Sequence, residues 1–129
     1  MKNGTILNKE LSEAVASMGH GDMMIVSDAG FPIPNDAWRV DLAVKKDLPR
    51  LETVLEVLSE SLIPETISYA QAISEYNPEL EKNVKDIFDR WAPEYKPVEH
   101  KTLLENYSEN AKVIVRTGAF NPWGNIALI

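Results

Sequence analysis

The sequence predicts a single-domain α/β protein, a three-layer sandwich with a mixed β-sheet that spans residues 1–129. Segments with the 3.6-residue periodicity of amphipathic helices alternate with short apolar runs typical of buried strands. A chain of 129 residues has the length of one ordinary domain, which excludes a multidomain protein. The last two expected strands lie too close in sequence for a helical crossover, which indicates a mixed rather than a fully parallel sheet.

The first expected helix and strand precede a proline-containing loop. Asn8 is expected to cap the helix, because its side-chain oxygen accepts a free N–H of the first turn, and Gly19 is a suitable end. The apolar face of this helix comprises Leu7, Leu11, Ala14, Val15 and Met18. Residues 23–27 form a short apolar run typical of a strand buried on both faces. The segment 28–36 contains two prolines and a glycine and is therefore expected to be a loop.

A second strand and three more helices are expected in the middle of the chain. Val or Leu stands at every second position of 39–44, which predicts a strand. Pro49 is suited to the start of the next helix. Its buried stripe comprises Leu51, Val54, Leu55 and Leu58. A cap and first turn at 77–78 open a helix that ends before Pro93, and residues 101–107 show a weaker helical pattern.

Three further strands complete the expected sheet. Residues 66–70 have strand composition, and residues 113–116 and 125–129 look like closing strands around a turn that contains Gly and Pro. The polar stretch 95–97 shows neither a helix nor a strand pattern. Alternating helices and strands of this kind are typical of an α/β layered fold.

The charge and composition exclude several classes of function. With 13 Lys and Arg against 20 Asp and Glu, the net charge of −7 repels phosphate backbones and anionic lipid, so neither nucleic acid nor a membrane is expected as a partner. The absence of cysteine excludes a disulfide scaffold, a thiolate zinc site, an iron–sulfur cluster and a cysteine nucleophile. No stretch has the pattern of a secretory signal or a membrane span, so a soluble, cytoplasmic protein is expected.

The two histidines are the candidates for proton transfer near neutral pH. His20 follows the end of the first helix, and Asp28 follows the carboxyl end of the first strand, where open α/β sheets place ligand crevices. If the two meet there, the carboxylate fixes the tautomer of the imidazole and favours its role as a general acid. The alternatives are a packing or surface role for each histidine and a turn-capping role for Asp28. The spacing of histidines and carboxylates predicts no metal site.

A polar turn before the last expected strand contains Trp123 and Asn125. An indole beside an amide is a common way to hold a polyol ring, because the indole stacks on C–H groups and the amide bonds hydroxyls. The alternative is a tight connection in which Trp123 packs in the core. The sequence contains no glycine-rich phosphate loop, nucleophile elbow or dinucleotide fingerprint, so nucleotide and acyl-transfer chemistry lack support.

Several segments of the chain resemble the D-ribose pyranase and L-fucose mutarotase family. The resemblance runs, in order, through residues 4–8, 18–22, 28–34, 39–43, 116–118 and 125–126. The stretch from His20 to Ala43 carries the most specific part of it, whereas residues 61–95 are only loosely similar. The resemblance therefore covers nearly the whole chain.

The resemblance implies a cofactor-free sugar isomerase that interconverts ring or anomeric forms of a monosaccharide. His20 matches the family's proton donor, and Asp28 and His100 match sugar-contacting positions. Asn125 matches the Asn of a final aromatic-X-Asn motif, in which Trp123 replaces the usual Tyr. It also implies a homo-oligomer of pentameric rings, commonly a decamer. Such rings predict sites shared between subunits, with the region of His100 or Trp123 supplied by a neighbour.

This chemistry suits the residues that the sequence offers. Opening a cyclic hemiacetal requires a proton on the ring oxygen and removal of the anomeric hydroxyl proton, with no metal or redox group. We expect His20 to donate to the ring oxygen and Asp28 to orient His20. His100 and Asn125 are expected to hold sugar hydroxyls.

Two subclasses and one other class of function stay open. Segments 32–34 and 39–43 look more like the pyranase, which favours pyranose–furanose exchange of D-ribose. Gly21 and Gly124 look more like the mutarotase, for which L-fucose anomer exchange is the alternative. A sugar-binding ring protein without catalysis is the alternative of another class, because Trp123 departs from the family pattern.

Overall fold

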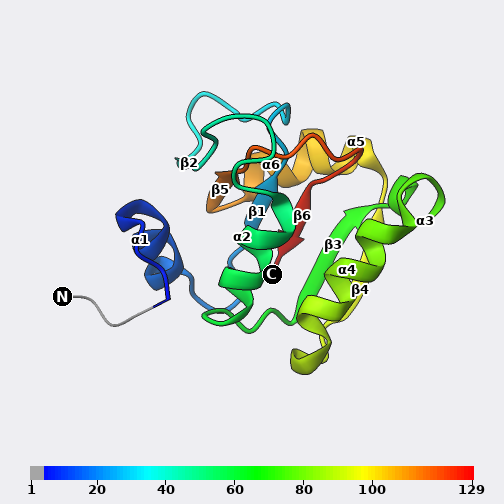
Figure 1. Cartoon of the computed structure of the whole chain (residues 1–129), viewed down its shortest axis with the longest axis horizontal. Coiled ribbons are helices and arrows are strands. Elements are labelled where there is room, and N and C mark those ends of the chain that lie inside the picture. Colours follow the sequence, from blue (N-terminus) through cyan, green and yellow to red (C-terminus); the bar gives the residue numbers. More distant parts are fainter. Residues whose placement is uncertain (1–4) are drawn as a thin grey trace.

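A computed structural model describes residues 5–129 and shows a six-stranded mixed sheet with helices on both faces (Figure 1). The strand order is β2-β5-β1-β6-β3-β4. The strands are β1 (Met24–Ser27), β2 (Arg39–Asp41), β3 (Thr66–Ala70), β4 (Glu94–Val98), β5 (Val113–Arg116) and β6 (Ile126–Leu128). Gly4, where the family resemblance begins, lies outside the described residues.

Six α-helices and two short helical segments of other types accompany the sheet in residues 5–129. They are α1 (Lys9–Ser17), α2 (Leu51–Ser59), α3 (Ala72–Tyr76), α4 (Pro78–Phe88), the 3₁₀ turn η1 (Asp89–Trp91), α5 (His100–Thr102), the π-helix η2 (Leu103–Tyr107) and α6 (Ser108–Asn110). The last three elements follow one another without a break. Within the described part of the chain, no helix is long and apolar enough to cross a membrane.

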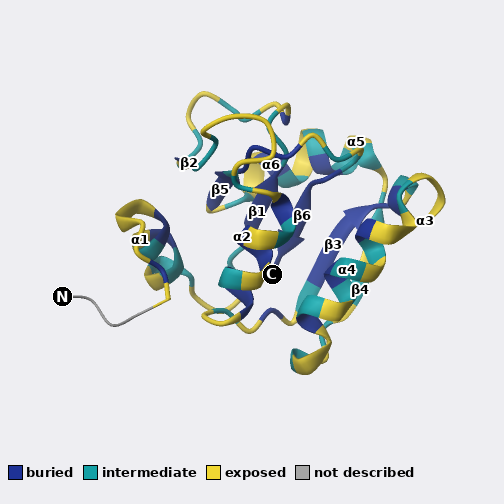
Figure 2. Ribbon diagram, viewed as in Figure 1, coloured by how far each residue is buried: buried dark blue, intermediate teal, exposed yellow. Residues whose placement is uncertain are grey.

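The sheet separates two hydrophobic cores, and this confirms the predicted three-layer α/β sandwich with a mixed sheet. Because side chains alternate between the faces of a strand, Met24 and Val26 of β1 enter the core beneath α1, α2 and α4. Ile25 enters the other core, which contains Leu103 of the helical segment 100–110. All four residues of β1 are buried, as predicted for a strand covered on both faces, and Figure 2 shows the buried sheet between helices with exposed outer faces.

The strand directions determine which loops meet at each edge of the sheet. β1 runs parallel to β5, and β5 runs parallel to β2. β6 is antiparallel to both β1 and β3, while β3 and β4 are parallel to each other. The loops that follow β1, β3 and β4 therefore lie at the same edge as the loop that precedes β6.

Several predicted elements are confirmed with their expected boundaries. Asn8 caps α1 by accepting a hydrogen bond from the backbone N–H of Leu11 at 2.9 Å. The stripe of α2 is buried as expected, and β3 and β5 cover the predicted residues. Leu7 is an exception on α1's predicted face, since it is 78% exposed.

The second strand is shorter than predicted. β2 ends at Asp41, whose Oδ1 accepts the backbone N–H of Ala43, and Val44 beyond it is 76% exposed. The apolar alternation of 39–44 therefore continues into a turn in which Val44 and Leu48 are joined by a backbone hydrogen bond. The local turn overrides the strand pattern.

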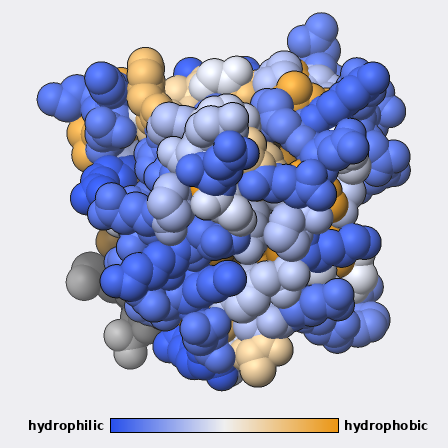
Figure 3. Space-filling view, turned by 90° about the vertical axis from the view of Figure 1, so that its right-hand side faces the viewer, coloured by the Kyte–Doolittle hydropathy of each residue, from blue (hydrophilic) through white to orange (hydrophobic). Residues whose placement is uncertain are grey.

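The sequence pattern missed α3 and β4. β4 is an edge strand with no fully buried residue, and its Pro97 lacks the N–H that a central strand needs. Figure 3 shows that the side of the molecule carrying α4 and β4 is mainly hydrophilic. β5 and β6, expected as closing strands around a turn, are not neighbours, because β1 lies between them.

Candidate functional site

Four of the predicted site residues line one pocket at the edge where β1 and β4 end and β6 begins. The pocket has a volume of about 220 Å³ and is lined by Asp28, Gly30, Phe31, Pro32, His100, Leu104, Trp123 and Asn125. Asp28 directly follows β1, His100 begins α5 after β4, and Asn125 directly precedes β6. Strand direction thus gathers side chains that are distant in sequence, as expected for the carboxyl edge of an open sheet.

Asp28 and Asn125 are joined by a direct contact. The backbone N–H of Asp28 donates to Oδ1 of Asn125 at 3.0 Å, and Asn125 is only 2% exposed. Oδ1 of Asp28 accepts the backbone N–H of Gly30 at 3.1 Å, so the turn-capping alternative is also correct for this residue. Asp28 therefore caps its own loop and faces the pocket.

The carboxyl of Asp28 has a perturbed acidity. Burial raises its pKa above the ordinary value of 3.8. The backbone N–H groups of Gly30 and Phe31, the side chain of Asn125 and the electrostatic interaction with His100 act in the opposite direction. A buried carboxyl with a raised pKa is a stronger base when ionised than an exposed one, which suits proton transfer.

His100 presents an unsatisfied nitrogen at this site. Its Nδ1 is buried and has no hydrogen-bond partner among residues 5–129. A buried polar atom without a partner is energetically costly, but an atom that solvent does not reach is not open to a ligand in this arrangement. His100 nevertheless lines the pocket. The surface role that the sequence left open for His100 is therefore not supported.

Trp123 is both a packing residue and a residue of the pocket wall. It packs against both hydrophobic cores while it lines the pocket. Its indole stacks on Tyr76, with ring centroids 5.1 Å apart and an interplanar angle of 23°. It also lines a neighbouring cavity of about 440 Å³, together with Asp28, Arg116 and Phe120.

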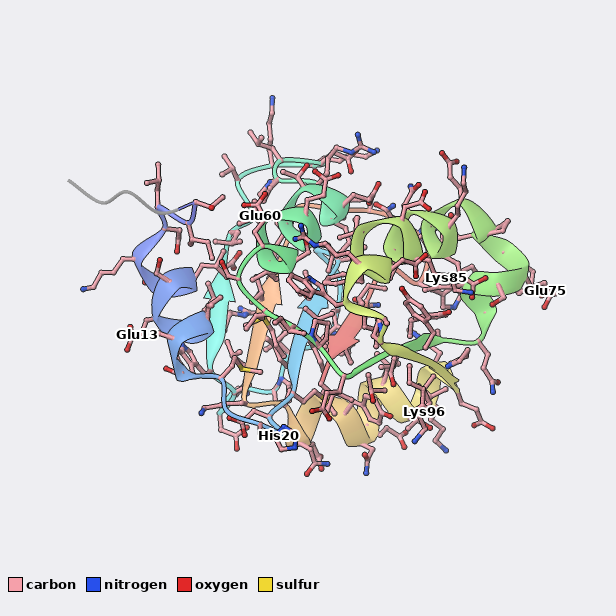
Figure 4. The ribbon with its side chains drawn as sticks, turned by 90° about the horizontal axis from the view of Figure 1, so that it is seen from below. Glu13, His20, Glu60, Glu75, Lys85 and Lys96 are labelled. Carbon is pink, nitrogen blue, oxygen red and sulfur yellow. The ribbon has the colours of Figure 1, made fainter. Side chains whose placement is uncertain are left out.

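His20 lies at the opposite edge of the sheet, on the loop between α1 and β1 (Figure 4). β1 separates it from Asp28, and residues 24–28 alone span about 13 Å at the rise of a strand. The expectation that His20 and Asp28 meet in one crevice is therefore wrong within a single chain, because one residue precedes β1 and the other follows it. The region of His100 or Trp123 was expected to come from a neighbouring subunit. Both residues line the pocket of the same chain, and His20 is the predicted site residue that this pocket does not contain.

A carboxylate that the sequence reading missed contacts His20. Oε1 of Glu65 lies 3.2 Å from Nδ1 of His20, and the two side chains are 73% and 84% exposed. Glu65 precedes β3 at the same edge, and its backbone N–H donates to the carbonyl of Ile129. Glu65 is thus the carboxylate beside His20, where Asp28 was expected from the sequence. It lies in the loosely matching region, 45 residues after His20, so no local pattern pointed to it.

Two further aspartates near these segments, Asp22 and Asp41, have structural partners. Oδ2 of Asp22 accepts the backbone N–H of Gly19 at 2.8 Å and the ammonium of Lys112 at 3.0 Å. These contacts hold the pKa of Asp22 below its usual value. The carboxylate of Asp41 accepts hydrogen bonds from the backbone N–H of Ala43 and from the guanidinium of Arg116. Within residues 5–129, no group of three or more His, Asp or Glu side chains is arranged to hold a metal ion.

Comparisons with known proteins agree with this architecture. A model of the RbsD / FucU transport protein family matches residues 1–129. D-ribose pyranase 2 of Rubrobacter xylanophilus is 48% identical over 129 residues, which cover 100% of this chain and 82% of that protein.

Solved structures show the same fold. Bacillus subtilis RbsD complexed with D-ribose superposes with a TM-score of 0.91 at 32% identity, over 99% of this chain and 95% of the other. The fucose mutarotase of Streptococcus pneumoniae in complex with L-fucose has a TM-score of 0.77 at 20% identity, over 99% and 96% of the two chains, which is a likeness of fold. The match to the family model and the identity to the R. xylanophilus protein show that the chain belongs to the RbsD / FucU transport protein family.

Proposed function

We propose that this chain is a cofactor-free isomerase that interconverts the pyranose and furanose forms of D-ribose. The observation that carries the proposal is the single pocket in which Asp28, His100 and Asn125 surround a small cavity walled by Trp123. The name of the R. xylanophilus relative and the sugar in the B. subtilis structure favour ribose.

The reaction requires one proton donor and one proton acceptor. A cyclic hemiacetal opens when the ring oxygen gains a proton and the anomeric hydroxyl loses one, which gives the open-chain aldehyde. Closure through another hydroxyl gives the other ring size, and rotation about the carbonyl carbon before closure gives the other anomer. Each general acid or base typically contributes a rate factor of ~10²–10⁴.

The pocket residues divide these tasks according to their surroundings. The ionised carboxylate of Asp28 accepts the anomeric hydroxyl proton, because burial raises its pKa and makes it the stronger base. The imidazole of His100, which lines the pocket, pairs with a sugar hydroxyl. Asn125 fixes the loop of Asp28 and holds a second hydroxyl. Trp123 stacks on the C–H groups of the ring.

The proton donor is His20 of a second copy of the chain. Within one chain β1 separates His20 from the pocket, and the imidazole is exposed at the opposite edge. A head-to-tail contact between copies brings one edge of the sheet to the other edge of its neighbour, and such contacts form a ring when the rotation between copies closes. We therefore extend the proposal to a homo-oligomer, with the pentameric rings and decamers that the family resemblance implies.

A second candidate is anomer exchange of a sugar such as L-fucose. Trp123 favours it, because an indole offers a larger stacking surface and no acceptor for a hydrogen bond. Ring opening is common to both reactions, so the same residues serve either one. A sugar-binding protein without catalysis is the remaining candidate.

Exchange spectroscopy by NMR tests all three candidates in one experiment. D-ribose and L-fucose are measured with and without protein, in the presence of a chelator, and the exchange rates between pyranose, furanose and anomeric signals are compared. Faster pyranose–furanose exchange of ribose supports the main proposal. Acceleration of fucose anomer exchange alone supports the second candidate. Saturation transfer from protein to sugar without faster exchange identifies a binding protein and contradicts the isomerase proposal.

A further inference from the structure

The turn that carries Trp123 has an unusual backbone conformation. Trp123 has a φ of 55°, in the left-handed region that large side chains rarely adopt. The turn is closed by a hydrogen bond from the backbone N–H of Gly124 to the carbonyl of Asn121. A strained residue of this kind persists only when its surroundings hold it in place.

Two residues at the corner between α3 and α4 hold this turn from outside. Tyr76 stacks on the indole of Trp123, and Nδ2 of Asn77 donates to the carbonyl of Pro122 at 3.2 Å. Both contacts join segments that are more than 40 residues apart, and α3 follows β3 at the same edge of the sheet (Figure 1). The corner therefore fixes the orientation of the indole.

The corner itself is firmly attached to the sheet. Ile73 of α3 is 1% exposed in the core. Glu81 of α4 accepts hydrogen bonds from Ser74 of α3 at 2.7 Å and from Tyr69 of β3 at 2.8 Å. Tyr76 is 62% exposed and is therefore not required to fill the core. Its ring is placed against Trp123 on a rigid support.

Trp123 lines two neighbouring cavities. The pocket of about 220 Å³ contains His100 and Asn125, and the neighbouring cavity of about 440 Å³ contains Arg116 and Phe120. Asp28, Gly30 and Trp123 line both of them. A displaced indole would join the two spaces into one larger cavity beside Asp28.

We propose that Tyr76 is a positioning residue that determines sugar specificity by holding Trp123 as the partition between these two cavities. The inference rests on the proposed function, because the smaller pocket is taken as the site of the reacting sugar. With the partition in place, the site fits a pentose-sized ring. Without it, the site loses a stacking surface for ribose and gains space for a larger sugar.

Three variants test this role. Tyr76→Ala removes the stacked ring, Tyr76→Phe keeps it without the hydroxyl, and Glu75→Ala removes the neighbouring side chain of the same helix, which Figure 4 shows at the outer edge of the molecule. The exchange rate is measured against sugar concentration for D-ribose and for a hexose, D-glucose. Thermal unfolding is recorded for each variant.

We expect Tyr76→Ala to raise the KM for ribose about two- to tenfold, as for loss of one aromatic pair, with a smaller change in kcat. The ratio of hexose to ribose exchange should rise with it. Tyr76→Phe and Glu75→Ala should behave like the wild type. Unchanged KM and unchanged sugar ratio in Tyr76→Ala overturn the proposal, as does an equal loss for both sugars that follows the loss of thermal stability.

A measurement without sugar keeps the inference separate from the proposed function. The indole proton signals of Trp123 are assigned by their absence in Trp123→Phe, and their nuclear Overhauser effects to neighbouring pocket side chains report the place of the indole independently of the ring current of Tyr76. Loss of these effects in Tyr76→Ala and their retention in Tyr76→Phe show the positioning even if no sugar is exchanged. If the wild type exchanges no sugar, the proposed function fails. If it exchanges ribose but the Overhauser effects of the indole are the same in all variants, the positioning role alone fails.

Discussion

The two edges of the β-sheet differ in how completely they form a site. At the edge where β1 ends, Asp28, His100 and Asn125 follow or precede three different strands and line one pocket. Asn125 is buried and Asp28 and His100 are half-buried, and Asp28 interacts with both of the others. At the edge where β1 begins, His20 and Glu65 form one exposed contact beside a separate cavity of about 340 Å³. The first edge gathers polar side chains of one chain into a pocket. The second edge presents its imidazole outward, where only another molecule can use it.

The largest expected effect comes from removing the proton donor or acceptor. His20→Gln and Asp28→Asn should each lower the exchange rate of ribose by ~10²–10⁴, since each removes one general acid or base. They should differ in binding: His20→Gln keeps the pocket and its affinity, whereas Asp28→Asn weakens binding. Exchange spectroscopy and calorimetric titration with ribose separate the two effects. Full activity of His20→Gln would show that the exposed edge has no part in the chemistry.

His100→Ala tests whether the edge where β1 ends binds the sugar. This variant should weaken the affinity for ribose more than it lowers the rate of the bound sugar's exchange. The imidazole of His100 lines the pocket and is expected to bond a sugar hydroxyl, and loss of such a bond costs roughly 1–3 kcal/mol, or about a 5- to 150-fold weaker affinity. Titration with ribose measures this change. An unaltered affinity would place the sugar outside the pocket lined by His100.

Trp123→Tyr should alter the preference between sugars while leaving the His20 chemistry in place. The phenol of Tyr is smaller than the indole, and it can both donate and accept a hydrogen bond. The variant should therefore favour D-ribose over a methyl-bearing deoxysugar such as L-fucose by about 1–3 kcal/mol. The ratio of ribose to fucose exchange rates in the two proteins measures the shift. Identical ratios would indicate that Trp123 acts only in packing.

The smallest expected effect concerns the stability of the pocket edge. Because burial raises the pKa of Asp28, the native state binds its proton more tightly than the unfolded state, and stability falls as pH rises through this pKa. Asp28→Asn removes this loss, so its melting temperature relative to the wild type should increase as pH rises from below 3.8 towards neutrality. A melting-temperature difference that does not change with pH would show that the fold does not disfavour the Asp28 carboxylate.

The sequence predicted the pocket edge well and the other edge poorly, for physical reasons. Asp28 and Asn125 directly flank strands with strong apolar patterns, so their place at the edge follows from the strand ends. His20 also lies near β1, but on the side where the strand begins, and proximity in sequence was taken for proximity in space. Glu65 and Tyr76 depend on tertiary contacts of β3 and α3, which no local periodicity records. The sequence pattern did not predict the edge strand β4, because its largely exposed residues show no alternation of apolar and polar side chains.

The central claim is that the two edges act together through different copies of the chain, and mixing two inactive variants tests it directly. His20→Gln and Asp28→Asn are co-expressed, mixed oligomers are verified by native mass spectrometry, and ribose exchange is measured. In a closed ring of randomly mixed copies, about one quarter of the sites pair an intact His20 with an intact Asp28 pocket, so about that fraction of wild-type activity should return. If mixed oligomers form and no activity returns, both residues must act from the same chain, which contradicts the account.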